Sequence, residues 1–566
     1  MAPEDREALP FDPTLVHWEH YLRHAIYGLR HFVLKEKLER PGKPGDSNLI
    51  AIKKNYFDDL YWAFTNGADV SPPGRRELTQ KVLNSRGVRQ AIRQLLEERQ
   101  ARLNLPPASE ASAEQSLLQA AERICEEMFS QYNMTALRVF AYSLNKIFRR
   151  IYEMVNISVE AFAELKRLQA RGPLVLIPTH RSYIDFLIIS FIFFCQGIRC
   201  PFIAAAEDFL GMLLVHHLLR ASGAFFIKRK GIEFPALYKA VLAEYITCVL
   251  ASNQNLEFFI EGTRSRTGKL LPPKFGILKV VTSAVEAGLR VLEGETFPYE
   301  LLGEEKVKES LSRLIKASEV VLDNYGRIFI EVCPPISCKE FQAQHGPRAL
   351  QRLGWEIVYR MSEQTVVMTT ALVSTVILTA RRGMREEELN QAVVWLSGLV
   401  EKKGYKLGGG YEHTPSVAVS DALKFLSGYV DRTRRNVFEV NIQAKDIEAK
   451  SLLMLAYYRN TITHIFYNDA VLAVALASFG REQARAGVGE EALTERALWL
   501  ADLLREEYVL RTLLSRETVQ AVIEGMAGQK ILEAEQGKVR AGLFLDRICQ
   551  FVWPIVEGYW LAFLYL

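Results

Sequence analysis

The chain is organised around Pro178-Thr179-His180-Arg181-Ser182-Tyr183-Ile184-Asp185, a polar stretch between two short apolar runs. The run before it, residues 174–177, is too short for a helix and predicts a buried strand. The run after it, residues 186–195, predicts a buried helix with Asp185 in its first turn. On a regular helix, side chains five residues apart diverge by about 140°, but across a strand-to-helix junction they can meet. We therefore predict that Asp185 binds one ring nitrogen of His180 and leaves the other free as a base.

A second pair with the same spacing, His464 and Asp469, lies within a long helical pattern from Leu452 to Leu476. There the two side chains point in different directions, so they do not form a base–acid pair. The bare spacing arises readily by chance, and only its context is informative. We interpret His464 as a partly buried helix residue.

The composition is typical of a folded globular protein large enough for two or more domains. Of 566 residues, 49% are hydrophobic and 24% are charged, and the net charge is only +4. So small a charge does not favour nucleic acid as a partner. The cysteine count of 7 is odd, and the polar start of the chain does not resemble a secretion signal, which together favour a reducing compartment.

Two cysteine pairs have a spacing that zinc sites also use, Cys195/Cys200 and Cys333/Cys338. The nearest downstream histidines, His216 and His217, are adjacent on a helical pattern and do not complete a ligand set. We therefore favour buried cysteines near strand ends and predict no metal site.

Short apolar runs alternate with helical patterns from about residue 171 onward, which predicts an α/β domain with a mostly parallel sheet. This α/β domain is expected over residues 171–345. A helical N-terminal region (1–110), a helical lead-in (111–170) and a helical C-terminal region (346–566) flank it, with a linker at 106–116. The expected strands are residues 174–177, 202–205, 224–227, 256–260 and 327–332.

The sequence contains no run of 18 uncharged apolar residues, so a membrane-spanning helix is not predicted. The apolar, aromatic segment 551–566 fits two interpretations. It either dips into a membrane interface or packs in a C-terminal core.

A basic loop, Glu261 to Lys269, follows the expected strand 256–260. It differs from a phosphate-binding P-loop in its glycine spacing, and Leu270 stands where that loop needs Ser or Thr. In an extended loop, Arg264 and Arg266 project the same way, and two parallel guanidinium groups suit a phosphate dianion. The alternative is a solvated basic loop.

A second basic segment, Lys228-Arg229-Lys230, ends the expected strand 224–227. Gly223 precedes that strand and allows a close approach of backbone or ligand. A solvated loop is again the alternative. Because ligands bind at the carboxyl ends of parallel strands, we expect the three polar clusters to share one edge of the sheet.

Together the clusters resemble the glycerolipid acyltransferase superfamily. The His180–Asp185 stretch, the residues Gly223, Phe226 and Arg229, and the stretch Phe259–Arg266 resemble its first three signature blocks in order. Further segments are similar to the dihydroxyacetone phosphate acyltransferases, to which glycerol-3-phosphate acyltransferases are related. These segments are residues 180–187, 208–212, 222–226 and 273–276.

The resemblance implies acyl transfer from acyl-CoA to the hydroxyl of dihydroxyacetone phosphate, the first step of ether-lipid (plasmalogen) synthesis. His180 is then the base, steered by Asp185, and acyl-CoA is a co-substrate with no cofactor or metal. The residues implied to hold the substrate phosphate are Arg264, Arg266, Arg229 and Lys228. Those implied to be substrate-binding or structural are Arg181, Ser182, Gly223, Phe226, Glu261, Gly262 and Thr263.

The resemblance also implies peripheral attachment to the matrix face of the peroxisomal membrane and a complex with an alkyl-transferring ether-lipid enzyme. The last residues, Leu564-Tyr565-Leu566, do not match a peroxisomal address. A further departure is the fourth family block, a strand with a proline. The helical pattern 275–287 runs directly into residues 291–295, so we expect the sheet to lack a strand beside the site.

Three other functions remain as alternatives. The first is a glycerol-3-phosphate acyltransferase, and the second is an inactive scaffold form without the fourth block. The third, a serine hydrolase, is disfavoured because no G-x-S-x-G motif is present and Ser182 is too close in sequence to His180 to partner it.

Overall fold

The computed structural model describes residues 56–68, 72–103, 110–182, 184–206, 213–228, 230–286, 292–296, 326–380, 383–408, 414–433, 437–440 and 450–565. Residues 1–55 of the predicted N-terminal helical region lie outside these ranges. The described part of that region is helical, as predicted. Its helices are α2 (Tyr56–Thr65), α3 (Arg75–Leu83) and α4 (Arg86–Leu103).

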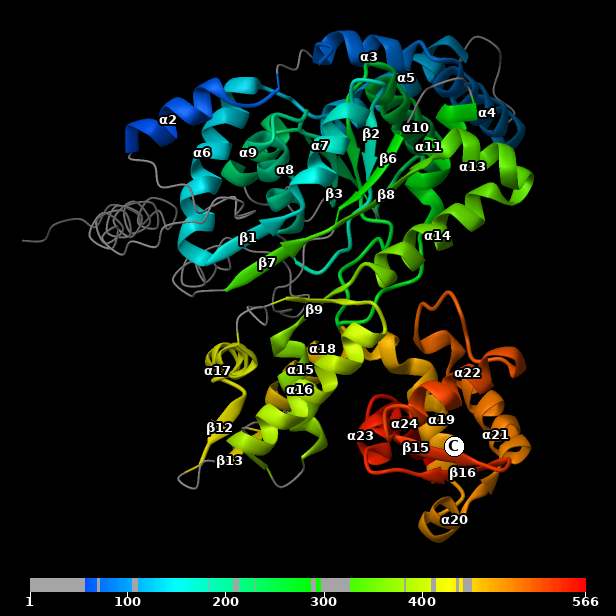
Figure 1. The fold of residues 1–566 in the computed structure, drawn as a ribbon. Helices are drawn as coiled ribbons and strands as arrows, with labels where there is room; N and C mark the ends of the chain where they lie inside the picture. Colours follow the sequence, from blue (N-terminus) through cyan, green and yellow to red (C-terminus); the bar gives the residue numbers. More distant parts are fainter. Residues whose placement is uncertain are drawn as a thin grey trace, which may run out of the picture. The chain divides into compact units, whose positions relative to one another are not determined.

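A six-stranded sheet forms the centre of the α/β region (Figure 1). Its strands, in spatial order, are β4 (Ala224–Ile227), β3 (Phe202–Ala206), β5 (Leu256–Glu257), β2 (Leu174–Leu176), β6 (Leu292–Thr296) and β8 (Val332–Ser337). Neighbouring strands from β4 to β6 are parallel, and β8 pairs antiparallel with β6. The mostly parallel sheet predicted from the alternating pattern is therefore present.

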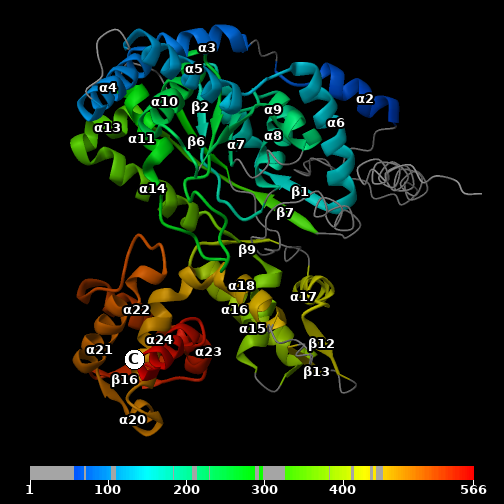
Figure 2. The same cartoon turned by 180° about the vertical axis from the view of Figure 1, so that it is seen from behind.

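Helices cover both faces of this sheet, as Figures 1 and 2 show from opposite sides. Val175 and Ile177 of the β2 run join one core, whereas Leu174 and Leu176 join the other. Burial on both faces explains why the strand sequences are continuously apolar and not alternating. One face carries α6 (Met134–Ile151), α7 (Val159–Leu168), α8 (Asp185–Cys195) and α9 (Leu213–Ala221). The other carries α5 (Glu110–Met128), α10 (Pro235–Ala251), α11 (Phe275–Glu286), α13 (Cys338–His345) and α14 (Ala349–Glu363).

Three local predictions were wrong. The lead-in is not helical throughout, because β1 (Met154–Ile157) pairs with β7 (Arg327–Ile330) in a separate two-stranded parallel sheet. For the same reason β7 does not join the six-stranded sheet. The linker expected at 106–116 is helical from Glu110, since its alanine and glutamate residues favour helix.

The prediction that the sheet lacks a strand beside the site was also wrong. β6 follows α11 and lies parallel to β2, in register from Leu174 opposite Leu292 to Leu176 opposite Gly294. On its other side β6 pairs with β8. The chain after α11 therefore occupies the position beside β2, and this edge of β2 is not exposed.

From Val367 onward the C-terminal region packs around a core of its own, whereas α14 packs on the sheet. Its helices are α15 (Thr369–Thr379), α16 (Glu386–Lys402), α17 (Pro415–Phe425), α18 (Lys450–Asn460), α19 (Tyr467–Ala477), α20 (Arg481–Ala486), α21 (Glu490–Leu503), α22 (Arg516–Ala527), α23 (Leu545–Cys549) and α24 (Trp553–Tyr565). It also contains short strands in small sheets, which the helical prediction missed. The long helix predicted over 452–476 is broken between α18 and α19 by a 3-10 turn, Thr463–Phe466. The predicted domain boundaries stay predictions.

Candidate active site

His180 and Asp185 meet at the turn between β2 and α8. Their side chains approach to 3.2 Å between Nδ1 of His180 and Oδ2 of Asp185. The same Oδ2 accepts hydrogen bonds from the backbone N–H groups of Arg181 and Ser182, each at 2.8 Å. Asp185 is buried at the start of α8, where the helix dipole and these donors stabilise a carboxylate. The turn thus holds the carboxylate in place against one nitrogen of the imidazole.

His180 also lines a cavity of about 840 Å³ at the carboxyl ends of the strands. The ring stacks on Phe259, with centroids 4.0 Å apart and planes at 24°. Among the described residues, Nε2 has no hydrogen-bond partner, and the side chain is 17% exposed. Stacking and the Asp185 contact therefore orient the ring and leave one nitrogen accessible.

Glu261 links the histidine turn to the basic loop through its two carboxyl oxygens. Its two carboxyl oxygens accept the backbone N–H groups of His180, at 2.8 Å, and Leu271, at 3.1 Å. The residue is buried, and burial raises its pKa to about 7, although the bond from the His180 backbone N–H opposes the shift. Glu261 therefore has a positioning role and does not face the cavity.

The basic loop reaches the cavity with Arg264 but not with Arg266. Gly262, Thr263 and Arg264 line the cavity together with His180. Arg266 is exposed and is not among the lining residues. Gly262 has φ +68°, and a Cβ there would come within 3.1 Å of the Lys274 side chain. Of the two predicted phosphate ligands in this loop, the geometry brings Arg264 alone to His180.

The C-terminal region holds the far end of the same loop. The Nδ2 of Asn460, at the end of α18, donates to the Thr267 carbonyl at 2.9 Å. Lys269 pairs with Glu507 at 2.7 Å. A Cβ at Gly268 would lie 2.2 Å from the Tyr457 carbonyl oxygen, so only glycine permits this approach.

Arg181 secures the loop from the other side. It is buried, and its Nη1 donates to the Gly268 carbonyl at 2.7 Å. The histidine turn and the C-terminal region therefore both contact the loop that carries Arg264.

Lys228 of the second basic segment does not line this cavity. Lys228 forms an ion pair with Glu127 of α5, and its backbone N–H donates to the Tyr238 hydroxyl at 2.7 Å. The predicted phosphate ligand Arg229 lies outside the described residues.

Gly223 and Phe226 have structural surroundings. Gly223 has φ +113°, and a Cβ there would lie 2.8 Å from the Pro201 carbonyl oxygen, so the close approach is to backbone. Phe226 is buried in the core, under the guanidinium of Arg220.

Sequence reasoning missed Glu257 and the role of Phe259. Glu257 is fully buried in β5, and burial followed by the nearby Asp185 charge raises its pKa well above the ordinary value. Its carboxyl oxygens have no hydrogen-bond partner among the described residues. An acidic residue within an apolar strand was the available signal for this buried, proton-binding group.

The second His-x4-Asp pair does not form a site. Nε2 of His464 contacts the Ser362 carbonyl at 3.2 Å, whereas Asp469 pairs with Lys403 at 2.6 Å. Burial lowers the pKa of His464 to about 4. Within the described ranges, no group of three His, Cys, Asp or Glu residues is arranged to hold a metal ion.

Two family models cover most of the chain. The one described as acyltransferase matches residues 161–293, which contain the histidine turn and the basic loop. The one described as glycerol-3-phosphate acyltransferase C-terminal region matches residues 298–566. The protein is therefore an acyltransferase.

Its relatives indicate which acyltransferases the chain is similar to. The dihydroxyacetone phosphate acyltransferase of Mus musculus is 30% identical, over 91% of this chain and 79% of that protein. The Homo sapiens protein of the same name is 29% identical, over 88% of this chain and 77% of its own length. A glycerol-3-phosphate acyltransferase of Aeromonas hydrophila is 26% identical, over 88% of this chain and 62% of that protein. The chain belongs to the family of the dihydroxyacetone phosphate acyltransferases, to which the glycerol-3-phosphate acyltransferases are related.

Proposed function

We propose that the protein transfers a fatty acyl group from acyl-CoA to the hydroxyl of dihydroxyacetone phosphate, the first step of ether-lipid synthesis. The observation that carries the proposal is the His180–Asp185 contact of 3.2 Å, with His180 lining the cavity. A histidine oriented by a carboxylate, with its second nitrogen accessible, is suited to general-base catalysis.

In the proposed reaction, Nε2 of His180 takes the proton of the acceptor hydroxyl as its oxygen attacks the thioester carbonyl carbon. The tetrahedral intermediate collapses, the carbon–sulfur bond breaks, and the CoA thiolate leaves. The imidazolium returns its proton to the thiolate. Asp185 stabilises the charged ring during the reaction, and no covalent enzyme intermediate or cofactor is required.

The cavity offers different surroundings to the two substrates. Arg264 lies on the same cavity as His180 and is proposed to bind the acceptor phosphate. Between α10 and α11 the lining includes Leu242, Ile277 and Val280, which are suited to the fatty chain. Arg266, Arg229 and Lys228 stay predictions for the phosphate site.

The base assignment is tested by His180→Ala, with the exposed His217→Ala as the matched control. We expect His180→Ala to lower kcat for palmitoyl transfer to dihydroxyacetone phosphate by about 10²–10⁴-fold, the usual contribution of a general base. His217→Ala should retain activity. Equal activity in His180→Ala and the original chain contradicts the assignment, and an inactive original chain supports the scaffold alternative.

The acceptor is tested by measuring transfer to dihydroxyacetone phosphate and glycerol 3-phosphate side by side. The family match over residues 298–566 makes glycerol 3-phosphate the second candidate. Arg264→Ala should raise the KM for either phosphorylated acceptor while affecting glycerol or dihydroxyacetone little. A similar loss with the unphosphorylated acceptors contradicts phosphate binding by Arg264.

Membrane attachment in the peroxisome and a complex with an alkyl-transferring enzyme remain expectations from the family. Among the helices that the structure describes, none is long and apolar enough to cross a bilayer.

A further inference from the structure

A second cavity, of about 750 Å³, adjoins the candidate active site along α11. Phe275 lines the second cavity, and the next two residues, Gly276 and Ile277, line the first. Phe275 packs on α14 at Gly354, where a Cβ would lie 2.5 Å from its ring. Consecutive residues in the first turn of α11 therefore line the two cavities.

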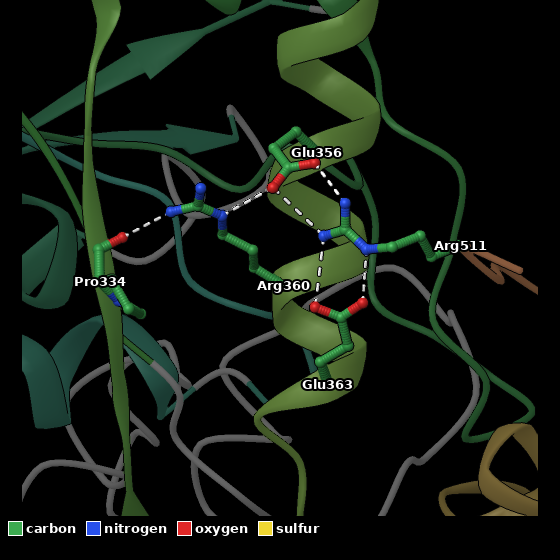
Figure 3. A network of polar contacts seen from close by, with 5 residues as sticks. All are labelled: Pro334, Glu356, Arg360, Glu363 and Arg511. Atoms are coloured by element: carbon green, nitrogen blue, oxygen red, sulfur yellow. Dashed lines mark hydrogen bonds and ion pairs between the residues drawn. The ribbon is translucent and has the colours of Figure 1, made fainter.

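The charge of Arg511, which lines the second cavity, is compensated by two carboxylates. Figure 3 shows Arg511 held by Glu356 and Glu363, while Glu356 also accepts a bond from Arg360. Arg511 is 2.6 Å from Glu356 and 2.5 Å from Glu363. These charges balance one another.

Two further arginines, Arg348 and Arg352, line the same cavity one helical turn apart. Both are exposed, and neither has an ion-pair partner within the described part of the chain. Their charges are therefore available to an anion.

Aromatic rings continue the same face of α14. Trp355 and Tyr359 follow Arg352 at helical spacing and line the cavity. Their ring centroids are 5.8 Å apart with planes at 29°, and Trp355 is 36% exposed. A flat apolar surface beside two free guanidinium groups is suited to a planar base that carries phosphate groups.

We propose that this second cavity binds the phosphorylated adenosine end of the acyl donor, coenzyme A. The assignment rests on the proposed function, which places the thioester beside His180. The pantetheine arm then passes over residues 274–277, where the exposed Lys274 lies next to Gly262. Arg348 and Arg352 bind the phosphates, and Trp355 stacks on the adenine.

Binding is measured by calorimetry with CoA and with adenosine 3′,5′-bisphosphate, which need no turnover. The test variant is Arg348→Gln/Arg352→Gln. The control is Arg481→Gln/Arg485→Gln, an exposed pair with the same spacing on α20. We expect the test variant to bind both ligands about tenfold or more weakly, and the control to bind as the original chain does. Unchanged binding overturns the proposal.

Kinetics with two donors separates the nucleotide site from the catalytic site. In the test variant, the KM for palmitoyl-CoA should rise about tenfold, with kcat unchanged. The KM for palmitoyl-pantetheine, which lacks the nucleotide, should not change. An equal rise for both donors overturns the proposal.

Other ligands of similar chemistry are distinguished in the same experiments. If ATP binds as tightly as CoA through these arginines and the KM for palmitoyl-CoA does not change, the cavity binds a free nucleotide, which overturns the CoA assignment. If the test variant loses binding to phosphatidylserine vesicles but still binds CoA, the surface contacts a membrane, which also overturns it.

The proposed function can fail separately. An inactive original chain that binds CoA through Arg348 and Arg352 overturns the catalytic proposal alone. If the chain is active but its affinity for CoA is unchanged in Arg348→Gln/Arg352→Gln, only the proposed nucleotide site is overturned.

Discussion

At the residue scale, Glu261 couples protonation to stability. Burial raises its pKa from an ordinary 4.5 to about 7. Between these values the folded protein keeps a proton that the unfolded chain releases, so the free energy of unfolding falls as pH rises. This stabilisation is fully present below pH 4.5 and is lost as the pH passes about 7.

We predict that Glu261→Gln flattens this part of the pH profile. Up to about 3 kcal/mol of pH-dependent stability should disappear, since one pKa unit corresponds to about 1.4 kcal/mol. Urea unfolding at pH 5 and pH 8 measures the difference, with the exposed Glu387→Gln as the control. The same slope in Glu261→Gln and the original chain contradicts the shifted pKa.

At the element scale, the loop from Gly262 to Lys269 depends on its contact with α18. Gly268 has φ +82°, and the Tyr457 carbonyl oxygen occupies the space beside its Cα. Gly404 has nearly the same φ, +83°, with no atom near its Cβ position. The two glycines therefore differ in packing but not in backbone strain.

We predict that Gly268→Ala is more damaging than Gly404→Ala. Both substitutions should cost about 1–2 kcal/mol of backbone strain. Gly268→Ala must also displace either α18 or the loop, which moves Arg264 and raises the KM for the phosphorylated acceptor. Denaturant midpoints and acceptor kinetics measure the two effects. If both variants behave alike, α18 does not position the loop.

At the scale of the whole molecule, Arg511 joins the part of the chain that follows α14 to α14 itself. Its guanidinium reaches two carboxylates, Glu356 and Glu363, and lies over the Tyr359 ring at 5.3 Å. Glu356 has a lowered pKa, chiefly because of its hydrogen bond with Arg511. The contact is 41% exposed on the arginine side, so solvent and salt weaken it.

We predict that Arg511→Gln lowers the free energy of unfolding by about 1 kcal/mol at low salt, and by less in molar salt. The control is Arg516→Gln, whose partner Glu491 belongs to the same C-terminal region. Urea unfolding at two salt concentrations measures both variants. A larger or salt-independent loss would show that Arg511 acts through packing and not through its charge.

The sequence by itself determined the strand–turn–helix around His180, four strands of the six-stranded sheet (β2, β3, β4 and β5) and the family. These features depend on short apolar runs, turn residues and motif spacing, which act over a few neighbouring residues. The His180–Asp185 contact was predictable for this reason. His464 and Asp469 are separate as predicted, but in a broken helix and not in the continuous one that the pattern indicated.

Only the tertiary structure decided which distant segments meet. Strand order brings Glu261 next to the backbone of His180 and places β6 beside β2. Packing of the C-terminal helices brings α18 against Gly268. It also separates Lys228 from Arg264, although both follow strand ends. Such pairings depend on the summed packing of many residues far apart in sequence, and no local pattern encodes that sum.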